Sequence, residues 1–128
     1  MKKLIVLLLA LMLLTACGQA SENTQEVVYL NITAAEAKVL MESQTDYIIL
    51  DVRSQEEFDQ GHIPGAILIP DTEIAARAEA VLTDKDQLIL VYCRSGRRSK
   101  LASQALVELG YTNIREFGGI IDWPYDIE

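Results

Sequence analysis

Cys93 is the residue of this sequence with the clearest potential for chemistry. It follows the apolar run Leu88–Tyr92 and precedes a short polar loop, after which a helical pattern begins near Ser99. The loop carries three arginines: Arg94, Arg97 and Arg98. Free N–H groups and the helix dipole favour negative charge at a helix N-terminus, and the arginines add to the same field. The sequence therefore predicts a reactive thiolate at Cys93.

The cysteine count narrows what Cys93 can do. The chain has two cysteines. The other, Cys17, lies just after an apolar N-terminal segment, and we expect its thiol to be modified by lipid. Cys93 is then left without a partner, so we expect neither an internal disulfide framework nor a multi-cysteine metal site. The alternative, a buried structural thiol at the end of a strand, fits poorly with three neighbouring arginines.

The N-terminus has the pattern of an export signal. Lys2 and Lys3 precede the apolar run Leu4–Leu14, which is too short to span a membrane. The sequence Leu14-Thr15-Ala16-Cys17 resembles the processing site of bacterial lipoproteins, in which the cysteine becomes the lipid-modified first residue. That resemblance implies a membrane anchor through Cys17 in a bacterial cell envelope. Ordinary secretory cleavage near Ala16, without lipid, is the alternative.

These boundaries give three segments. We expect a lipoprotein signal peptide at residues 1–16, a lipid-anchored tether at residues 17–26 and a folded domain at residues 27–128. Removing the two lysines of the signal leaves nine basic residues against nineteen acidic ones, a formal charge of −10. Such a charge argues against nucleic acid as a partner and against binding to anionic lipid by charge.

Strands and helices that could position Cys93 alternate along the domain. Apolar and β-branched runs predict five strands, at residues 27–30, 47–52, 66–69, 88–92 and 113–117. Helices are predicted at residues 34–43 and from Ser54 to Gly61, each after a capping box, and at residues 73–82 and 99–109. The third helix is expected to bury Ile74, Ala78, Val81 and Leu82, and the fourth Leu101, Ala102, Ala105, Leu106 and Leu109. Short connections between alternating elements predict an α/β fold with parallel strands.

In such sheets, ligands bind beyond the carboxyl ends of the strands. Asp51, Cys93 and Gly118 all fall at or just after predicted strand ends. We therefore expect these three residues to share one edge of the sheet.

The motifs around these positions resemble those of single-domain rhodaneses, a family of sulfurtransferases. The resemblance covers residues 27 to 124 and rests on four motifs in the expected order. They are Asp51-Val-Arg53, Glu57-Phe58 with Gly61-His62-Ile63-Pro64-Gly65-Ala66, Cys93-Arg-Ser-Gly96-Arg-Arg-Ser99, and Gly118-Gly119 with Trp123. The family fold it implies is a three-layer α/β/α domain with a mainly parallel central sheet of about five strands.

The resemblance also implies a reaction and its residues. Cys93 would take a sulfane sulfur from thiosulfate or a persulfide donor, hold it as a persulfide and pass it to an acceptor such as a thiol or cyanide. Its substrate-binding loop would comprise Arg94, Ser95, Gly96, Arg97, Arg98 and Ser99. Asp51 and Arg53 would support the loop. No metal or organic cofactor is implied, and a monomer is expected.

Two alternatives remain open at this point. Related phosphatases and arsenate reductases place an arginine six positions after the cysteine, where this chain has Ser99, although Arg98 could shift into that role. A sulfur carrier of the same fold, which loads Cys93 without turning over small donors, is the other. The sequence names neither the physiological donor and acceptor nor the membrane that is occupied.

The remaining polar residues have plainer interpretations. Asp51 and Arg53 are more typical of a structural hydrogen-bonding hub than of a catalytic acid and an anion clamp. His62 is expected to order its turn, and Trp123 to anchor the C-terminal end in the core. Five acidic residues are expected on solvated faces: Glu56, Glu57, Asp59, Asp84 and Asp86.

Overall fold

A five-stranded, all-parallel sheet forms the centre of the protein. The computed structural model describes Gly18 and residues 28–128, and Cys17 and the predicted signal lie outside the described residues. The strands are β1 (Leu30–Asn31), β2 (Tyr47–Asp51), β3 (Ile67–Leu68), β4 (Leu88–Cys93) and β5 (Ile114–Gly119). Their order in the sheet is β1-β5-β4-β2-β3. The predicted α/β fold is thereby confirmed.

The described residues also form four α-helices and two short 3₁₀ helices, the last of which follows β5. They are α1 (Ala34–Ser43), α2 (Gln55–Asp59), η1 (Asp71–Glu73), α3 (Ile74–Val81), α4 (Arg97–Glu108) and η2 (Ile120–Asp122). Both predicted capping boxes are present: Thr33 and Ser54 cap α1 and α2, each together with the glutamate three residues later.

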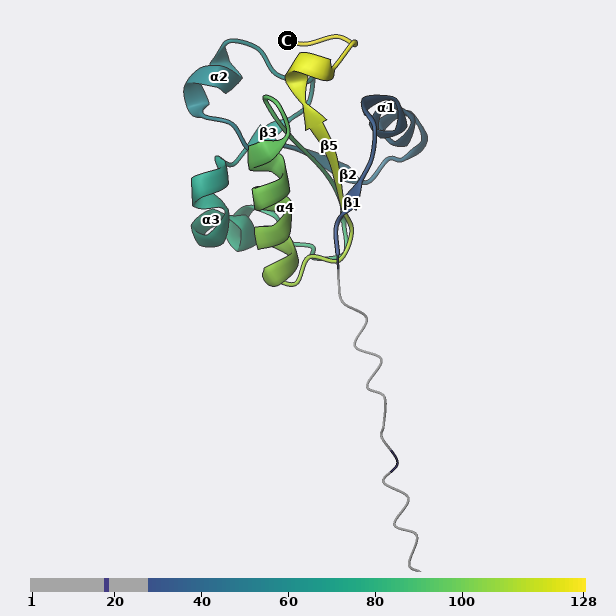
Figure 1. Cartoon of the computed structure of the whole chain (residues 1–128), viewed down its shortest axis with the longest axis vertical. Helices are drawn as coiled ribbons and strands as arrows, with labels where there is room; N and C mark the ends of the chain where they lie inside the picture. The colour runs from purple at the N-terminus through teal and green to yellow at the C-terminus, as the bar shows by residue number, and fades with distance from the viewer. Residues whose placement is uncertain (1–17, 19–27) are drawn as a thin grey trace, which may run out of the picture.

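The helices cover the sheet on both faces. α3 and α4 lie on one side of it and α1 on the other (Figure 1). Side chains of β4 alternate between the two cores, because successive residues of a strand point to opposite faces. Ile89, Val91 and Cys93 join the core beneath α3 and α4, whereas Leu90 and Tyr92 join the core beneath α1. Cys93 thus belongs to the α3/α4 side of the sheet.

Some predicted boundaries were wrong. The first strand was predicted at 27–30; among the described residues it is Leu30–Asn31, the two residues that pair with β5, and residue 27 lies outside the described residues. The fourth helix begins at Arg97, two residues earlier than predicted, because Gly96 serves as its N-cap residue.

Two predicted core residues are instead exposed. Val81 is 43% exposed, since the buried row of the third helix runs through Ile74, Ala78 and Leu82 at intervals of four residues. Leu101 is 56% exposed, because α4 turns the face containing Ser99, Ala102 and Ser103 inward. A hydropathy pattern does not predict a buried helix face that contains two serines.

Within the described residues, every helix is too short or too polar to cross a bilayer.

Candidate active site

The Cys93 sulfur lies beneath the loop that joins β4 to α4. Cys93 is the last residue of β4 and is 1% exposed. The backbone N–H of Gly96 donates a hydrogen bond to Cys93 Sγ at 3.0 Å. Gly96 has a φ of +109°, a conformation that glycine adopts without a steric penalty, and it is the N-cap of α4. The loop therefore directs a backbone donor at the buried sulfur.

The end of β5 holds this loop in place. Cys93 pairs in register with Gly119, and the N–H of Ile121 donates to the carbonyl oxygen of Arg94 at 3.2 Å. A Cβ atom on Gly119 would lie 1.9 Å from that same oxygen. Only glycine fits at this close backbone approach. The predicted Gly-Gly motif thus lies directly against the Cys93 loop.

Ser99 and Glu116 lie next to the sulfur inside the protein. Ser99 Oγ is 3.4 Å from Cys93 Sγ and 2.5 Å from Glu116 Oε1. Its other oxygen neighbours are the carbonyls of Gly96 at 2.9 Å and Gly118 at 3.3 Å. Glu116 is 2% exposed and also accepts from the N–H of Gly118 at 2.9 Å.

Glu116 was not predicted to belong to the site. It was placed in a predicted strand but given no role, although its position carries a signal. Alternate residues of a strand share a face, so Glu116 lies on the same face as the buried Ile114. A carboxylate at a strand position expected to be apolar is the sequence signal that could have indicated a role for Glu116.

The three arginines of the loop region differ in their surroundings. Arg94 and Arg97 are exposed and form no ion pair within the described residues. The Arg98 guanidinium donates to both carboxylate oxygens of Glu57, at 2.7 and 2.8 Å. These bonds, with others from Ser54, lower the pKa of Glu57 to about 2. The prediction that Glu57 is a solvated surface residue was therefore wrong, because α2 brings it against α4.

Asp51 and Arg53 form a buried hub at the end of β2. Arg53 Nε donates to both oxygens of Asp51, at 3.0 and 3.1 Å, and its Nη2 donates to Asp51 Oδ2 and to the carbonyl of Gly61, both at 2.7 Å. The Tyr92 hydroxyl donates to Asp51 Oδ2 at 2.7 Å. Burial, followed by this bond, raises the pKa of Tyr92. These contacts join β2, β4 and the turn at Gly61, as the structural interpretation requires.

His62 and Trp123 have structural surroundings. The His62 ring stacks on Phe58 at a centroid distance of 3.8 Å, with Nδ1 3.0 Å from the Phe58 carbonyl oxygen. The backbone of His62 pairs with that of Glu128 in both directions. Trp123 is 9% exposed and packs in the core near Phe117. Both arrangements match the predicted roles, in the turn and in the core.

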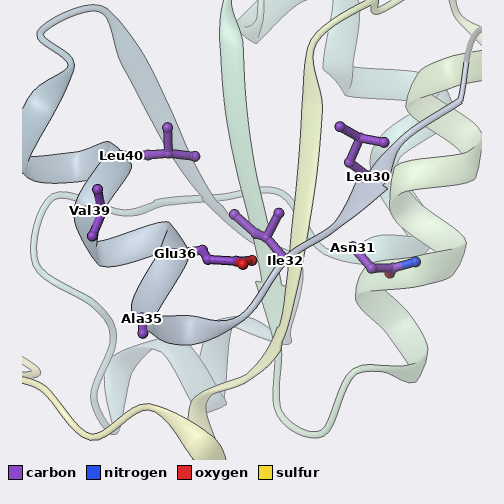
Figure 2. Close-up of a pocket in the computed structure, with 7 residues that line it drawn as sticks. All are labelled: Leu30, Asn31, Ile32, Ala35, Glu36, Val39 and Leu40. Atoms are coloured by element: carbon purple, nitrogen blue, oxygen red, sulfur yellow. The ribbon is translucent and has the colours of Figure 1, made fainter.

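Two surface grooves differ in their relation to Cys93. One, of about 580 Å³, borders the loop at Ser95, Gly96 and Arg97 and is completed by Tyr29, Lys100, Leu101 and Gln104. The other lies between β1 and α1, as Figure 2 shows, and contains no residue of the Cys93 loop. Within the described residues, no group of histidine, cysteine and acidic side chains is arranged to hold a metal ion.

Comparisons with known proteins point to one family. The sequence model of the rhodanese-like domain matches residues 33–124. The thiosulfate sulfurtransferase PspE of Escherichia coli is 41% identical over 73 residues, which cover 57% of this chain and 70% of PspE. The putative sulfur carrier protein YrkF of Bacillus subtilis is 35% identical over 105 residues, which cover 81% of this chain but only 55% of YrkF.

Solved structures show the same likeness. The structure of a rhodanese with anions from E. coli superposes with a TM-score of 0.60 at 36% identity, covering 64% of this chain and 96% of that one. The similarity therefore includes both the sequence and the fold.

Proposed function

This chain belongs to the rhodanese-like family, and on that basis we propose that it is a sulfurtransferase that carries the transferred sulfur on Cys93. The observation that carries the proposal is the position of the Cys93 sulfur. It lies under a backbone N–H at the N-terminus of a twelve-residue helix. Such a donor, together with the helix dipole, stabilises a thiolate and then a persulfide anion.

The proposed reaction has two displacement steps. In the first, the Cys93 thiolate attacks the outer sulfur of thiosulfate, the S–S bond of the donor breaks, and sulfite leaves with its electron pair. Cys93 then holds the sulfur as a persulfide. In the second step, a thiol or cyanide acceptor attacks the outer sulfur, and the Cys93 thiolate is released. A persulfide could replace thiosulfate as donor by the same chemistry.

The loop residues would have separate roles in these steps. Arg94 and Arg97 are exposed cations beside the loop and would attract the anionic oxygens of the donor. Arg98 is engaged by Glu57 and would fix the start of α4 relative to α2. Ser95 and Gly96 line the groove next to these cations, and Ser99 contacts the reacting sulfur from inside the protein.

A second candidate function is that of a sulfur carrier. The relative YrkF is named a putative sulfur carrier protein, and this observation favours the alternative. A carrier would load Cys93 from a partner protein and release the sulfur to another without turning over small donors. Steady formation of thiocyanate from thiosulfate and cyanide identifies an enzyme; a single sulfur loaded per chain, with no turnover, identifies a carrier.

Intact-mass measurement tests the proposal directly. The protein incubated with thiosulfate should gain about 32 Da, the mass of one sulfur atom, and release one sulfite for each sulfur bound. The variant Cys93→Ser should gain nothing. An unchanged mass in both proteins would mean that Cys93 does not take sulfur from thiosulfate.

We also propose that the protein is exported and held on a membrane by lipid at Cys17, on the basis of the Leu14-Thr-Ala-Cys17 sequence. The variant Cys17→Ala should move from the membrane fraction to the soluble fraction of lysed cells, whereas Cys93→Ser should remain with the membranes. Equal fractionation of the two variants would contradict lipid attachment at Cys17.

A further inference from the structure

Glu116 is a buried carboxylate that the proposed chemistry does not yet use. It is 2% exposed and forms no ion pair with any described residue. Its hydrogen-bond partners are the Ser99 hydroxyl at 2.5 Å and the Gly118 N–H at 2.9 Å. Burying a carboxylate without a cation is energetically costly. A side chain kept in this way next to a nucleophile calls for a chemical explanation.

Ser99 connects this carboxylate to the reacting sulfur. A hydroxyl has one proton to donate and two lone pairs to accept with, so Ser99 can accept from the Cys93 thiol while it donates to Glu116. The two distances from Ser99 Oγ are 3.4 Å to sulfur and 2.5 Å to the carboxylate oxygen. The carbonyls of Gly96 and Gly118 compete for the same proton, at 2.9 and 3.3 Å. The carboxylate is both nearer and charged, which makes it the stronger acceptor.

We propose that Cys93, Ser99 and Glu116 form a proton relay in which Glu116 takes the proton that Cys93 loses on becoming a nucleophile; the inference rests on the proposed sulfur transfer. The S–H bond of Cys93 breaks and its electron pair stays on sulfur. Ser99 Oγ receives that proton and passes its own proton to Glu116 Oε1, which becomes a neutral carboxylic acid. When the acceptor removes the outer sulfur, the Cys93 thiolate regains its proton by the reverse path.

One proton shared within the relay keeps one negative charge in the buried site. A thiolate and a carboxylate together would place two like charges there, which is unfavourable in a site of low dielectric. Other charged groups lie on the elements around the relay. They are Arg94 in the loop, Arg97, Arg98 and Lys100 on α4, Glu57 on α2 and Asp71 on η1. Arg115 on β5 is next to Glu116 in the strand and points to the opposite face of the sheet, where Asp51 of β2 bonds Tyr92. The test therefore changes Glu116 alone and leaves these groups in place.

The test is the pH dependence of Cys93 alkylation by iodoacetamide. In the wild-type protein the relay supplies thiolate without bulk base, so the rate should be nearly constant between about pH 5 and 7. Glu116→Gln can still accept a hydrogen bond from Ser99 but cannot take a proton. Its rate should be at least about tenfold lower at pH 6 and should rise about tenfold per pH unit, as for an ordinary thiol, until bulk solvent removes the proton.

The opposite result would overturn the relay. If Glu116 acts only as a nearby negative charge, its removal favours the thiolate, and Glu116→Gln will be alkylated as fast as the wild type at pH 6 or faster. Ser99→Ala provides a second variant, which cuts the link and leaves the carboxylate. It should show the same pH dependence as Glu116→Gln, and the double variant should be no slower; independent, additive losses would contradict a shared path. Ser99→Ala also carries the test if Glu116→Gln does not fold.

Two controls separate this inference from the proposed function. Glu108→Gln removes an exposed carboxylate at the other end of α4 and should match the wild type in alkylation. The thiosulfate mass gain of the wild-type protein is measured alongside. If the wild type gains sulfur but Glu116→Gln is alkylated normally, the relay is wrong and sulfur transfer stands. If the wild type gains no sulfur, the proposed transfer from thiosulfate fails whatever the alkylation profile.

Discussion

Replacing Glu57 by glutamine tests the ion pair that holds Arg98 beside the Cys93 loop. The carboxylate accepts two hydrogen bonds from Arg98, and its Oε2 also accepts from the backbone N–H of Ser54 at 3.0 Å. Glutamine keeps the length of the side chain and an oxygen for the Ser54 N–H. It loses the negative charge, so the variant isolates the electrostatic part of the contact.

The size and sign of the effect follow from the pKa of Glu57. The hydrogen bonds from Arg98, followed by those from Ser54, lower this pKa from 4.5 to about 2. Because the folded-state pKa lies below the unfolded-state value, the charged carboxylate stabilises the fold fully above about pH 4.5, and this contribution is lost as the pH falls towards 2. A pKa drop of this size corresponds to at most about 3 kcal/mol. Both side chains are about a quarter exposed, at 25% and 26%, so solvent screening reduces the contribution to about 1–2 kcal/mol.

Urea unfolding at two pH values measures this contribution. Glu57→Gln should lower the free energy of unfolding by about 1–2 kcal/mol at pH 7, and by clearly less at pH 3. Glu56→Gln is the matched control, because Glu56 is an exposed acid of the same helix with no ion pair among the described residues. Its effect should be small at both pH values. A loss for Glu57→Gln that is the same at pH 7 and pH 3, or equal to that of the control, would refute the electrostatic reasoning.

Three further variants test the loop support and the hub. Gly119→Ala should abolish sulfur loading of Cys93 in the intact-mass assay, because its Cβ atom would lie 1.9 Å from the Arg94 carbonyl oxygen; normal loading would contradict the close approach. Asp51→Asn should lower the free energy of unfolding, measured with urea, by roughly 3–5 kcal/mol, because it leaves the buried charge of Arg53 without its counter-ion. Tyr92→Phe should cost less, roughly 1–3 kcal/mol in the same assay, because it leaves the buried Ile63 N–H without its acceptor while Asp51 keeps its arginine; equal losses for the two variants would mean that charge does not dominate the hub.

The fold followed from the sequence where a single physical signal decided the local structure. β2 and β4 are continuous apolar runs, which a strand covered on both faces requires. Thr33 and Ser54 predicted two helix starts correctly, because a capping box is a local interaction between residues three apart. The start of α4 was less predictable. Its N-cap residue is Gly96 in a left-handed conformation, so no capping side chain marks the start of the helix.

The burial of polar residues on α4 could not be predicted from the sequence pattern either. Ser99 and Ser103 are fully buried, whereas Leu101 on the same helix is 56% exposed. From residue type alone, the two serines would be placed on the surface and Leu101 in the core. Hydropathy contains no information about the contacts that the tertiary structure creates. The hydroxyl of Ser99 is satisfied by Glu116, a residue from a strand that comes later in the chain. A partner that distant cannot be found from the helix sequence alone.

The charge around Cys93 is where sequence and structure differ most. Along the chain, three arginines follow the cysteine closely, and the field there is strongly positive. In space, Glu57 forms an ion pair with Arg98, and a second carboxylate, that of Glu116, contacts the Ser99 hydroxyl that lies next to the sulfur. Coulomb energy depends on distance in space and not on separation in sequence, so acids brought in by α2 and β5 offset much of the local positive charge. The donor that stays fixed on the sulfur is the Gly96 N–H at 3.0 Å. Stabilisation of the sulfur anion should therefore depend more on this amide and the helix N-terminus than on the number of arginines. Removing Arg97 should accordingly weaken the attraction of an anionic donor more than it changes the rate of alkylation by the uncharged iodoacetamide.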